Sequence, residues 1–375
     1  MRISILGYYG VPNTGDEAIL AGILQKLRAK FPGASIRVSA RDQFYVRRMH
    51  AVDTYPLERK IPAFLAVMSQ SDLLLVGGGG LLFDMPFQVL PFWLGRIVMA
   101  RCIGTPPILY SVGVGPITKR RSRLYLRSGL RFARIISVRD KSSANLLKEC
   151  GIRGDILLLP DPALLLLPAS QARAKEILRE EGIPDDGCLK VGISLRYWQA
   201  FDRSEQLRFL SEVAKAMDKL AKRYDVSFIL MPFQYPPALG DVGLMVELAS
   251  SCGCKGNIHI VRGQYAPEEV KALLGQMDLT LGMRLHSLIF SLTMAVPCVA
   301  LSYTNKVASF MESFESKDFC LPLKAVTEEN IVSLVEEAIE HRGYHSDRLR
   351  AISARIVKEV DGLHDSMLAR IDGMV

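Results

Sequence analysis

One segment places a titratable side chain where proton transfer next to an anion would need it. The turn Gly282-Met283-Arg284-Leu285-His286 follows a short apolar run and leads into an apolar helical pattern, so we expect His286 in the first turn of a helix. The positive end of a helix dipole favours bound anions there and disfavours a protonated imidazole. A lone histidine on an apolar helix is usually structural. The position of His286, just after Gly282 and Arg284 at a strand end, favours a functional role.

Two more cations follow strand-like segments. Arg139 ends the apolar run Ile135–Val138, and Lys306 comes shortly after the run Cys298–Leu301. Strand ends are where doubly wound sheets bind ligands. We therefore expect Arg139 and Lys306 to reach the same cleft as His286 from different elements.

Three turns are richer in glycine than a strand-to-loop turn requires. They lie in Gly7–Glu17, Gly77–Gly80 and Gly113–Gly115, each directly after a strand-like run. Glycine lets a ligand approach the bare backbone, and a free helix start binds anions. The plainer interpretation of the first turn is a loop with a well-capped helix start, because Thr14 and Glu17 have capping-box spacing. Candidate ligand-binding residues at these turns are Gly10, Asn13, Asp16, Gly78, Gly79, Asp84 and Gly113.

The glycine spacing does not match the dinucleotide fingerprint or the phosphate-binding P-loop, so no nucleotide cofactor is indicated. Short apolar runs alternate with amphipathic stretches, which is typical of parallel α/β sheets. With 375 residues, two domains are the default. We expect two doubly wound Rossmann-like domains that face a cleft. Their predicted ranges are 1–168 for the N-terminal domain, 188–345 for the C-terminal domain, and 346–375 for a terminal helix that packs back on the first domain.

The composition is basic, with 47 Lys and Arg against 39 Asp and Glu, a formal net charge of +8. This balance favours anionic partners. The seven cysteines are odd in number and scattered, and no segment resembles a signal peptide or a membrane span, so we expect a cytoplasmic protein with reduced thiols. There is no Asp-x-Asp run in the glycine turns and no cluster of histidines. His50, His259, His341, His345 and His364 show no evident partners.

A basic segment runs from Lys119 to Lys141, with nine Lys or Arg residues and the single acid Asp140. Arg123, Arg127, Arg131 and Arg134 have the spacing of one helical face. The plain interpretation is a solvated helix face. Together with the apolar segment from Met85 to Leu94, however, the basic residues would suit transient docking on an anionic membrane surface or a lipid phosphate. No RNA- or DNA-binding motif is present, so we do not expect nucleic acid as a partner.

The motifs together resemble those of the polysaccharide pyruvyl transferase family. The resemblance covers nearly the whole chain and rests on Gly7–Glu17, Gly77–Gly80, Ser137–Ser142, Asp161-Pro162 and, most specifically, Gly282–Ser287. It implies a glycosyltransferase-B-like fold, phosphoenolpyruvate as donor, and a ketal formed across two sugar hydroxyls. The bacterial CsaB-type subgroup is the most similar. For that subgroup the implied acceptor is N-acetylmannosamine on a lipid-diphosphate-linked precursor of a secondary cell-wall polymer, and the implied product is the 4,6-ketal that S-layer proteins recognise.

The chemistry of this donor suits the residues. Phosphoenolpyruvate carries a carboxylate and a phosphate, so it needs at least two cations, and its methylene carbon must be protonated. We predict that His286 is the acid and that Arg139 binds the donor carboxylate or phosphate. Lys306 or Arg284 would bind the phosphate. The carry-over from the family is firmest for Leu285 and His286, and the scheme needs no metal and no cofactor.

Two other functions stay open. A nucleotide-sugar glycosyltransferase of the same fold would use Glu312, which lies where such enzymes often hold ribose, although the usual paired-glutamate spacing is missing. A non-enzymatic module that binds an anionic glycolipid would use the basic segment but has no need of His286.

Overall fold

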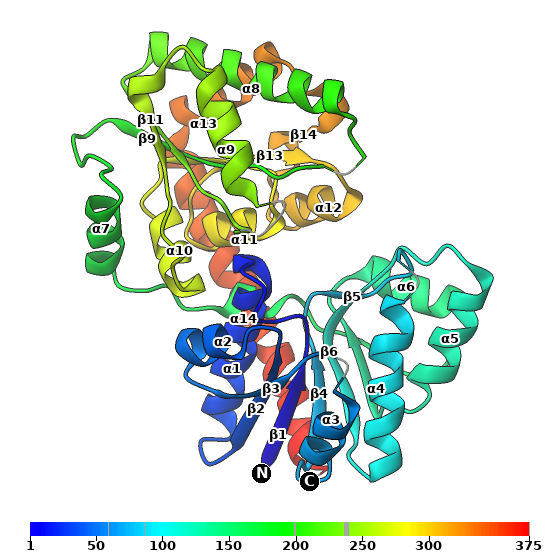
Figure 1. Cartoon of the computed structure of the whole chain (residues 1–375). Helices are drawn as coiled ribbons and strands as arrows, with labels where there is room; N and C mark the ends of the chain where they lie inside the picture. The colour runs from blue at the N-terminus through cyan, green and yellow to red at the C-terminus, as the bar shows by residue number, and fades with distance from the viewer. Residues whose placement is uncertain (59, 87, 199, 236–239, 375) are drawn as a thin grey trace. The chain divides into compact units, whose positions relative to one another are not determined.

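The computed structural model describes residues 1–58, 60–86, 88–198, 200–235 and 240–374 (Figure 1). Contacts divide the chain into two compact units. The first contains Met1–Val11, Asp16–Leu166 and Glu359–Val375, and the second contains Pro12–Gly15 and Leu167–Lys358. Pro12–Gly15 therefore belongs to the second unit although the chain on both sides of it belongs to the first, and Glu359–Val375 returns to the first unit. In the described part of the chain, no helix combines the length and the apolar composition that crossing a bilayer requires.

The first unit is built on a parallel sheet with the order β3-β2-β1-β4-β6-β7-β8, and β5 pairs with β6. The order reverses between β1 and β4, so the topological switch point lies at the turns after Leu6 and Gly77. The strands are β1 (Arg2–Leu6), β2 (Ser35–Ala40), β3 (Asp53–Pro56), β4 (Leu73–Gly77), β5 (Gly80–Leu82), β6 (Pro107–Val114), β7 (Ile135–Val138) and β8 (Ile156–Leu158).

Helices cover both faces of this sheet because its strands are apolar on both sides. Leu74 and Val76 of β4 pack in one buried cluster with four of the helices, while Tyr110 on β6 reaches the C-terminal helix on the other face. The helices of this region are α1 (Thr14–Lys30), α2 (Gln43–His50), α3 (Ile61–Met68), α4 (Val89–Ile103), α5 (Arg120–Leu130) and α6 (Lys141–Glu149). Those in the cluster with β4 are α3, α4, α5 and α6.

The second unit repeats the same topology. Its parallel sheet has the order β11-β10-β9-β12-β13-β14, with the switch point between β9 and β12. The strands are β9 (Leu189–Ser194), β10 (Val226–Leu230), β11 (Ile258–Ile260), β12 (Leu279–Gly282), β13 (Cys298–Ser302) and β14 (Cys320–Pro322). The helices are α7 (Gln171–Glu180), α8 (Arg203–Arg223), α9 (Asp241–Ser251), α10 (Pro267–Leu274), α11 (Leu285–Thr293), α12 (Asn305–Ser313) and α13 (Glu328–Glu340).

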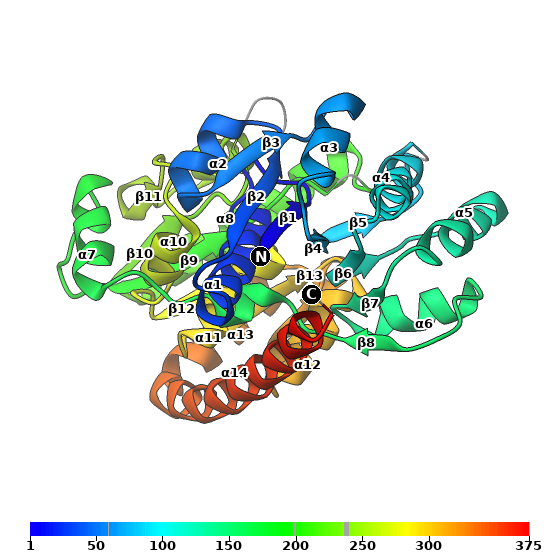
Figure 2. The same cartoon turned by 90° about the horizontal axis from the view of Figure 1, so that it is seen from below.

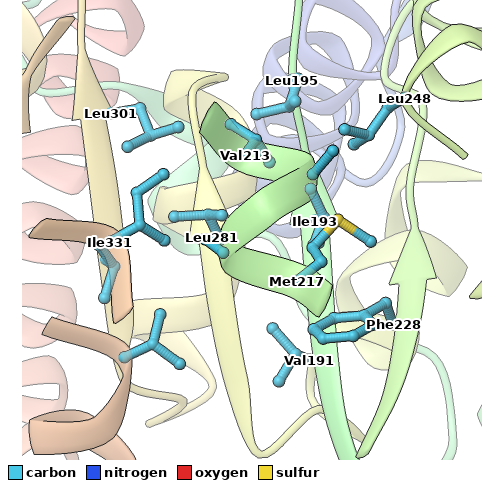
Figure 3. Close-up of a cluster of buried hydrophobic side chains, with 14 of the residues drawn as sticks. Val191, Ile193, Leu195, Val213, Met217, Phe228, Leu248, Leu281, Leu301 and Ile331 are labelled. Atoms are coloured by element: carbon cyan, nitrogen blue, oxygen red, sulfur yellow. The ribbon is translucent and has the colours of Figure 1, made fainter. Parts of the chain in front are cut away.

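The core of the second unit forms where α8 packs on the sheet. Val213 and Met217 of α8 point toward Ile193 of β9, and Phe228 of β10 lies beside them (Figure 3). These side chains are at most 2% exposed. Their burial removes apolar surface from water and anchors β9, from whose carboxyl end the candidate site begins.

The last helix, α14 (Arg342–Asp372), contributes its final residues to the first unit, where Figure 2 shows its end in red close to β7 and β8. His364 is fully buried there: its Nδ1 lies 2.6 Å from the Tyr110 hydroxyl and its Nε2 lies 3.0 Å from the Pro160 carbonyl oxygen. The Lys26 ammonium pairs with Asp361 and Asp365 of the same helix at 2.7 and 2.5 Å. A histidine that the sequence left without partners thus ties the C-terminal helix to the sheet.

The two doubly wound sheets confirm the predicted fold class, and three local expectations are wrong. The capping box is not formed, because the Glu17 carboxylate accepts the Gly10 N–H at 2.9 Å and contacts His50 at 2.7 Å. Arg131 and Arg134 lie beyond the end of α5, so the four predicted arginines do not share a helical face.

The apolar segment from Met85 to Leu94 is not an exposed aromatic margin. Leu90, Trp93 and Leu94 are residues of α4 whose side chains are buried in the core, while Met85 is 60% exposed. Phe87, which belongs to the same expectation, lies outside the described residues.

We expect the buried histidine to make stability fall with acid. Burial lowers the pKa of His364 to about 4, so the unfolded chain takes up a proton below pH 6.5 that the folded chain does not. The stabilising contribution is complete above pH 6.5 and is lost as the pH falls toward 4. About 2 kcal/mol should be lost by pH 5.

Urea unfolding at pH 7 and pH 5 measures this effect. The His364→Asn variant keeps an acceptor for Tyr110 but has no titrating ring, so it should lose less stability than the wild type over this interval. Identical pH dependence of the two proteins would contradict the assignment.

Candidate active site

The carboxyl ends of β9 and β12 meet at the switch point of the second unit and present Arg196 and Arg284. Both strands are runs of buried residues that pair in parallel from Leu279 with Val191 to Gly282 with Ser194. The Met283 N–H donates to the Ser194 carbonyl at 2.7 Å and extends this pairing by one residue. The turn after β12 therefore leaves the sheet at a fixed point.

Arg284 forms a buried ion pair with Asp241 at the start of α9. Its Nε and Nη2 donate to the two carboxylate oxygens of Asp241 at 3.0 and 2.5 Å, and Nη2 also donates to Gln234 Oε1 at 2.9 Å. Arg284 is 9% exposed and Asp241 is fully buried. Because Asp241 already engages the guanidinium in a bidentate contact, the geometry favours a positioning role for Arg284 over the predicted contact with donor phosphate.

The Asp241 carboxylate also orders the loop after β10. Its Oδ2 accepts the N–H groups of Phe233 and Gln234, each at 3.0 Å. The neighbouring segment Pro12–Gly15 pairs with this loop: the Thr14 N–H donates to the Phe233 carbonyl and the Tyr235 N–H to the Pro12 carbonyl, both at 2.8 Å. Residues 12–15 are thus held as an added strand-like edge of the second unit.

Gly15 packs against the imidazole of His286. A Cβ atom built on Gly15 would lie 2.3 Å from His286 Nδ1 and 2.9 Å from the ring carbons Cγ and Cε1. Real Cβ atoms do not approach other atoms so closely, so only glycine at position 15 leaves room for the ring. His286 lies in the first turn of α11, as expected from the sequence, and is half-buried.

Sequence reasoning missed Arg196, the cation directly after β9. Its guanidinium lies 5.3 Å from the Tyr303 ring centroid, and Nη1 lies 3.5 Å from the Tyr303 hydroxyl. Among the described residues, no carboxylate lies within ion-pairing distance of Arg196. Lys306 stands in the first turn of α12, and Glu312 near the end of the same helix pairs with Lys317 at 2.9 Å.

In the first unit, the glycine turns and Arg139 come together at the carboxyl edge of the sheet. The Gly113 N–H donates to the Gly79 carbonyl at 2.7 Å, and a Cβ on Gly113 would lie 2.9 Å from Arg139 Nε. Arg139 is itself neutralised, with Asp161 at 3.4 Å and Asp140 at 3.5 Å. This arrangement brings two of the predicted glycine turns together with Arg139.

Tyr9 forms a hydrogen bond with the backbone of the turn that follows β4. Its hydroxyl donates to the Gly77 carbonyl at 2.7 Å. Burial and then the negative charges of Asp16 and Glu17 raise the pKa of Tyr9 well above its ordinary value, so the hydroxyl stays a neutral donor. A Cβ on Gly79 would lie 3.3 Å from Asp16 Oδ1, which places Asp16 beside the turn.

A pocket of about 770 Å³ opens next to this turn. Asp16, Gly78 and Gly80 belong to its lining, and α4 contributes the aromatic rings of Phe92 and Trp93 together with Arg96. Pockets of this size and lining hold molecules with an apolar body and a few polar groups.

The position of Asp84 does not fit its predicted role in ligand binding. The side chain is fully buried and accepts the N–H groups of Thr118 and Lys119 at 2.8 and 2.9 Å. Burial raises the pKa of Asp84, but these backbone hydrogen bonds outweigh it and leave the pKa below its ordinary value. The carboxylate therefore fixes the loop before α5.

One group of side chains has the composition of a partial metal site. Asp218, Cys252 and Cys254 place ligand atoms within 4.8 Å of one another. The Asp218 carboxylate already accepts the N–H groups of Gly253 and Cys254, at 2.8 and 2.9 Å, which accounts for its position without a metal. This group stands on α8 and after α9, apart from the residues named above.

Comparison with solved structures defines the fold class. A crystal structure of Alr3699/HepE from Anabaena in complex with UDP and glucose matches all of both chains with 14% identity and a TM-score of 0.65. UDP-GlcNAc 2-epimerase from Neisseria meningitidis matches 96% of this chain and 99% of its own with 15% identity and a TM-score of 0.59. The E. coli ADP-heptose heptosyltransferase II matches 92% and 100% with 12% identity and a TM-score of 0.54. The chain has the glycosyltransferase-B fold, with its two Rossmann-like domains.

A family model narrows this class. The model for polysaccharide pyruvyl transferases matches residues 13–305, a range that contains Gly15, Arg139, Asp241 and His286. The chain belongs to the polysaccharide pyruvyl transferase family.

We expect the Asp241→Ala variant to be less stable by about 3 kcal/mol, because it leaves the Arg284 guanidinium buried without a counter-charge. Urea unfolding measures the difference. Replacing both partners, as Asp241→Leu with Arg284→Met, should recover a large part of the loss, since no buried charge remains. A double variant as unstable as the single one would show that the charge pair is not what holds this turn.

Proposed function

We propose that the chain transfers pyruvate from phosphoenolpyruvate to a sugar, with His286 as the proton donor. The observation that carries this proposal is the packing of His286 on Gly15 beside the buried pair Arg284–Asp241, in a member of the polysaccharide pyruvyl transferase family. A ring so closely bounded is held in one orientation, which proton transfer to a carbon atom requires.

The donor carries a carboxylate and a phosphate, so the site needs at least two cations. We assign these two groups to Arg196 and Lys306, which follow β9 and β13 of the same unit. Arg284 is replaced in this role because Asp241 neutralises it. Arg139, predicted to bind the donor carboxylate or phosphate, pairs with Asp161 and Asp140, so we do not assign the donor to it.

The proposed reaction balances without an added reagent. His286 gives a proton to the methylene carbon of phosphoenolpyruvate, and a sugar hydroxyl oxygen bonds to C2 and releases its own proton. The proton released by this first hydroxyl restores His286. Phosphate then leaves with the electron pair of its C–O bond, and a second hydroxyl of the same sugar bonds to C2 and gives its proton to the departing phosphate. The products are a ketal and inorganic phosphate, and the scheme is written without a metal or a cofactor.

The pocket at the first unit's glycine turn supports a lipid-linked acceptor. Asp16 and the exposed Gly80 suit sugar hydroxyls, and the rings of Phe92 and Trp93 on α4 suit the hydrocarbon of a lipid carrier. We infer that the acceptor is a lipid-diphosphate-linked oligosaccharide. More specifically, we propose β-D-N-acetylmannosamine of a secondary cell-wall polymer precursor, pyruvylated as the 4,6-ketal for S-layer anchoring by a cytoplasmic, membrane-peripheral enzyme.

The second candidate is a nucleotide-sugar-dependent transferase, since the Alr3699/HepE structure contains UDP and glucose. Glu312 does not favour it, because its carboxylate is 61% exposed and pairs with Lys317. Phosphate release from phosphoenolpyruvate, measured beside hydrolysis of a UDP-sugar, separates the two. Turnover of the UDP-sugar alone would favour the second candidate.

We expect His286→Ala to lower acceptor-dependent phosphate release by about 10²–10⁴-fold, because the carbon acid step loses its proton donor. The exposed His341 provides the matched control, and His341→Ala should keep wild-type turnover. Phosphate release by His286→Ala within a fewfold of the wild type would refute the role of His286.

Gly15→Ala tests the same ring without removing it. Alanine is the better helix former, so α1 should be no less stable, but its methyl group displaces the imidazole. Turnover should fall at least tenfold, roughly the cost of a misplaced catalytic group. Gly33→Ala is the control, because a Cβ there meets nothing within 4 Å. Equal turnover of the two variants would contradict a positional requirement on His286.

A further inference from the structure

A second pocket of the first unit has a volume of about 740 Å³. It lies at the amino edge of the sheet, which is the side where the parallel strands begin. It is formed where the chain enters β7 and β8, at residues 130–136 and 151–157, and by the last turns of α14 (Figure 2). The glycine turns follow the carboxyl ends of β4 and β6, so this pocket lies on the opposite edge of the same parallel sheet. It is therefore separate from the residues proposed for pyruvyl transfer.

The described lining residues of this pocket include five arginines and one acid, Asp155. All five arginines are exposed, and in the part of the chain that the structure describes none of them lies within 4.0 Å of a carboxylate oxygen. The fold gathers them from distant parts of the sequence: they are Arg127, Arg131, Arg134, Arg153 and Arg370. Such a concentration of unneutralised guanidinium groups attracts phosphate, which arginine binds with two donors at once.

Apart from Ser128 and Asp155, the remaining lining of this arginine pocket is apolar or glycine. Leu130, Ile135, Ile136 and Ile152 form part of it, and Leu124 on α5 is 65% exposed at its margin. Arginines above an apolar lining match a molecule with a phosphate group beside hydrocarbon. An exposed leucine next to arginines is the arrangement that peripheral proteins insert into an anionic bilayer surface.

Nucleic acid is the other polyanion that five arginines could bind. Single strands are held by aromatic side chains on which bases stack, together with a basic groove. The described residues that line the arginine pocket include no aromatic side chain. The chemistry therefore favours a phospholipid.

We propose that the arginine pocket binds the phosphate headgroups of anionic phospholipids and docks the chain on a bilayer surface. This docking proposal does not depend on the proposed pyruvyl transfer. The basic site is no longer the predicted helical face of Arg123–Arg134 but a pocket that also contains Arg153 and Arg370. It commits to lipid as the source of phosphate because of the apolar lining and the exposed Leu124.

Flotation of the full chain with vesicles tests the proposal. Vesicles of phosphatidylcholine with phosphatidylglycerol should bind the wild type, and vesicles of phosphatidylcholine alone should not. Arg131→Glu with Arg134→Glu should weaken binding at least tenfold, roughly the effect of four charge units at an anionic surface. The control is Arg47→Glu with Arg48→Glu on α2, exposed arginines of the same unit with the same change in net charge. Unchanged thermal unfolding of both double variants shows that they fold.

Three outcomes would overturn the proposal. The first is an equal loss of binding by both double variants, because only net charge would then matter, and the second is no binding of the wild type to either kind of vesicle. The third is binding of inorganic diphosphate or of single-stranded RNA by the wild type through Arg131 and Arg134 without vesicle binding. A further variant separates docking from simple attraction. Leu124→Ser should weaken vesicle binding several-fold at raised salt, and Leu207→Ser, at an exposed leucine of α8, should not. If both serine variants bind as the wild type does, the insertion of Leu124 is excluded and the proposed docking fails.

Discussion

The buried pair between Asp241 and Arg284 is the interaction on which the candidate active site depends. Asp241 holds the turn after β12 through Arg284 and the loop after β10 through the amides of Phe233 and Gln234. That loop in turn holds Pro12–Gly15, and Gly15 bounds the ring of His286, two residues after Arg284. The contacts form a closed circuit, so the position of His286 is fixed from both sides.

A buried ion pair of this kind is weak evidence for stability, because the desolvation of two charges offsets their attraction. Its value here is geometric. A hydrophobic pair of similar volume could fill the space, but it could not make the three side-chain hydrogen bonds that orient the loop, two from backbone amides to Asp241 and one from Arg284 to Gln234. The same bidentate contact gives Arg284 a positioning role, and for this reason the doubly acidic donor is assigned to other cations of the unit in the proposed scheme.

Much of the fold could be predicted from the sequence because buried parallel strands are short apolar runs. The predicted strand Ile135–Val138 coincides with β7, and the predicted run Cys298–Leu301 lies within β13. The edge strand β3, Asp53-Thr54-Tyr55-Pro56, has no such run and was missed. At the site, the turn with His286 was predicted from its place after a strand. Asp241 was missed because a pair formed across 43 residues leaves no local pattern. Asp84 was misjudged because burial of a loop carboxylate depends on tertiary contacts.

The first unit shows how one parallel sheet can present two chemically different surfaces. At its carboxyl edge, amides of the glycine turns donate to protein carbonyls, as Gly78 does to Tyr110 and Gly113 to Gly79, and Arg139 pairs with Asp161 and Asp140, so directed hydrogen bonds and ion pairs hold this edge. At its amino edge the arginines have no ion-pair partners among the described residues and surround an apolar lining, so recognition there depends on charge and hydrocarbon. Charge attraction acts over about 10 Å and tolerates many orientations, whereas hydrogen bonds do not. An edge that binds phosphate beside hydrocarbon is suited to holding the chain at a surface, whereas the internal hydrogen bonds and ion pairs of the carboxyl edge keep its turns in fixed positions.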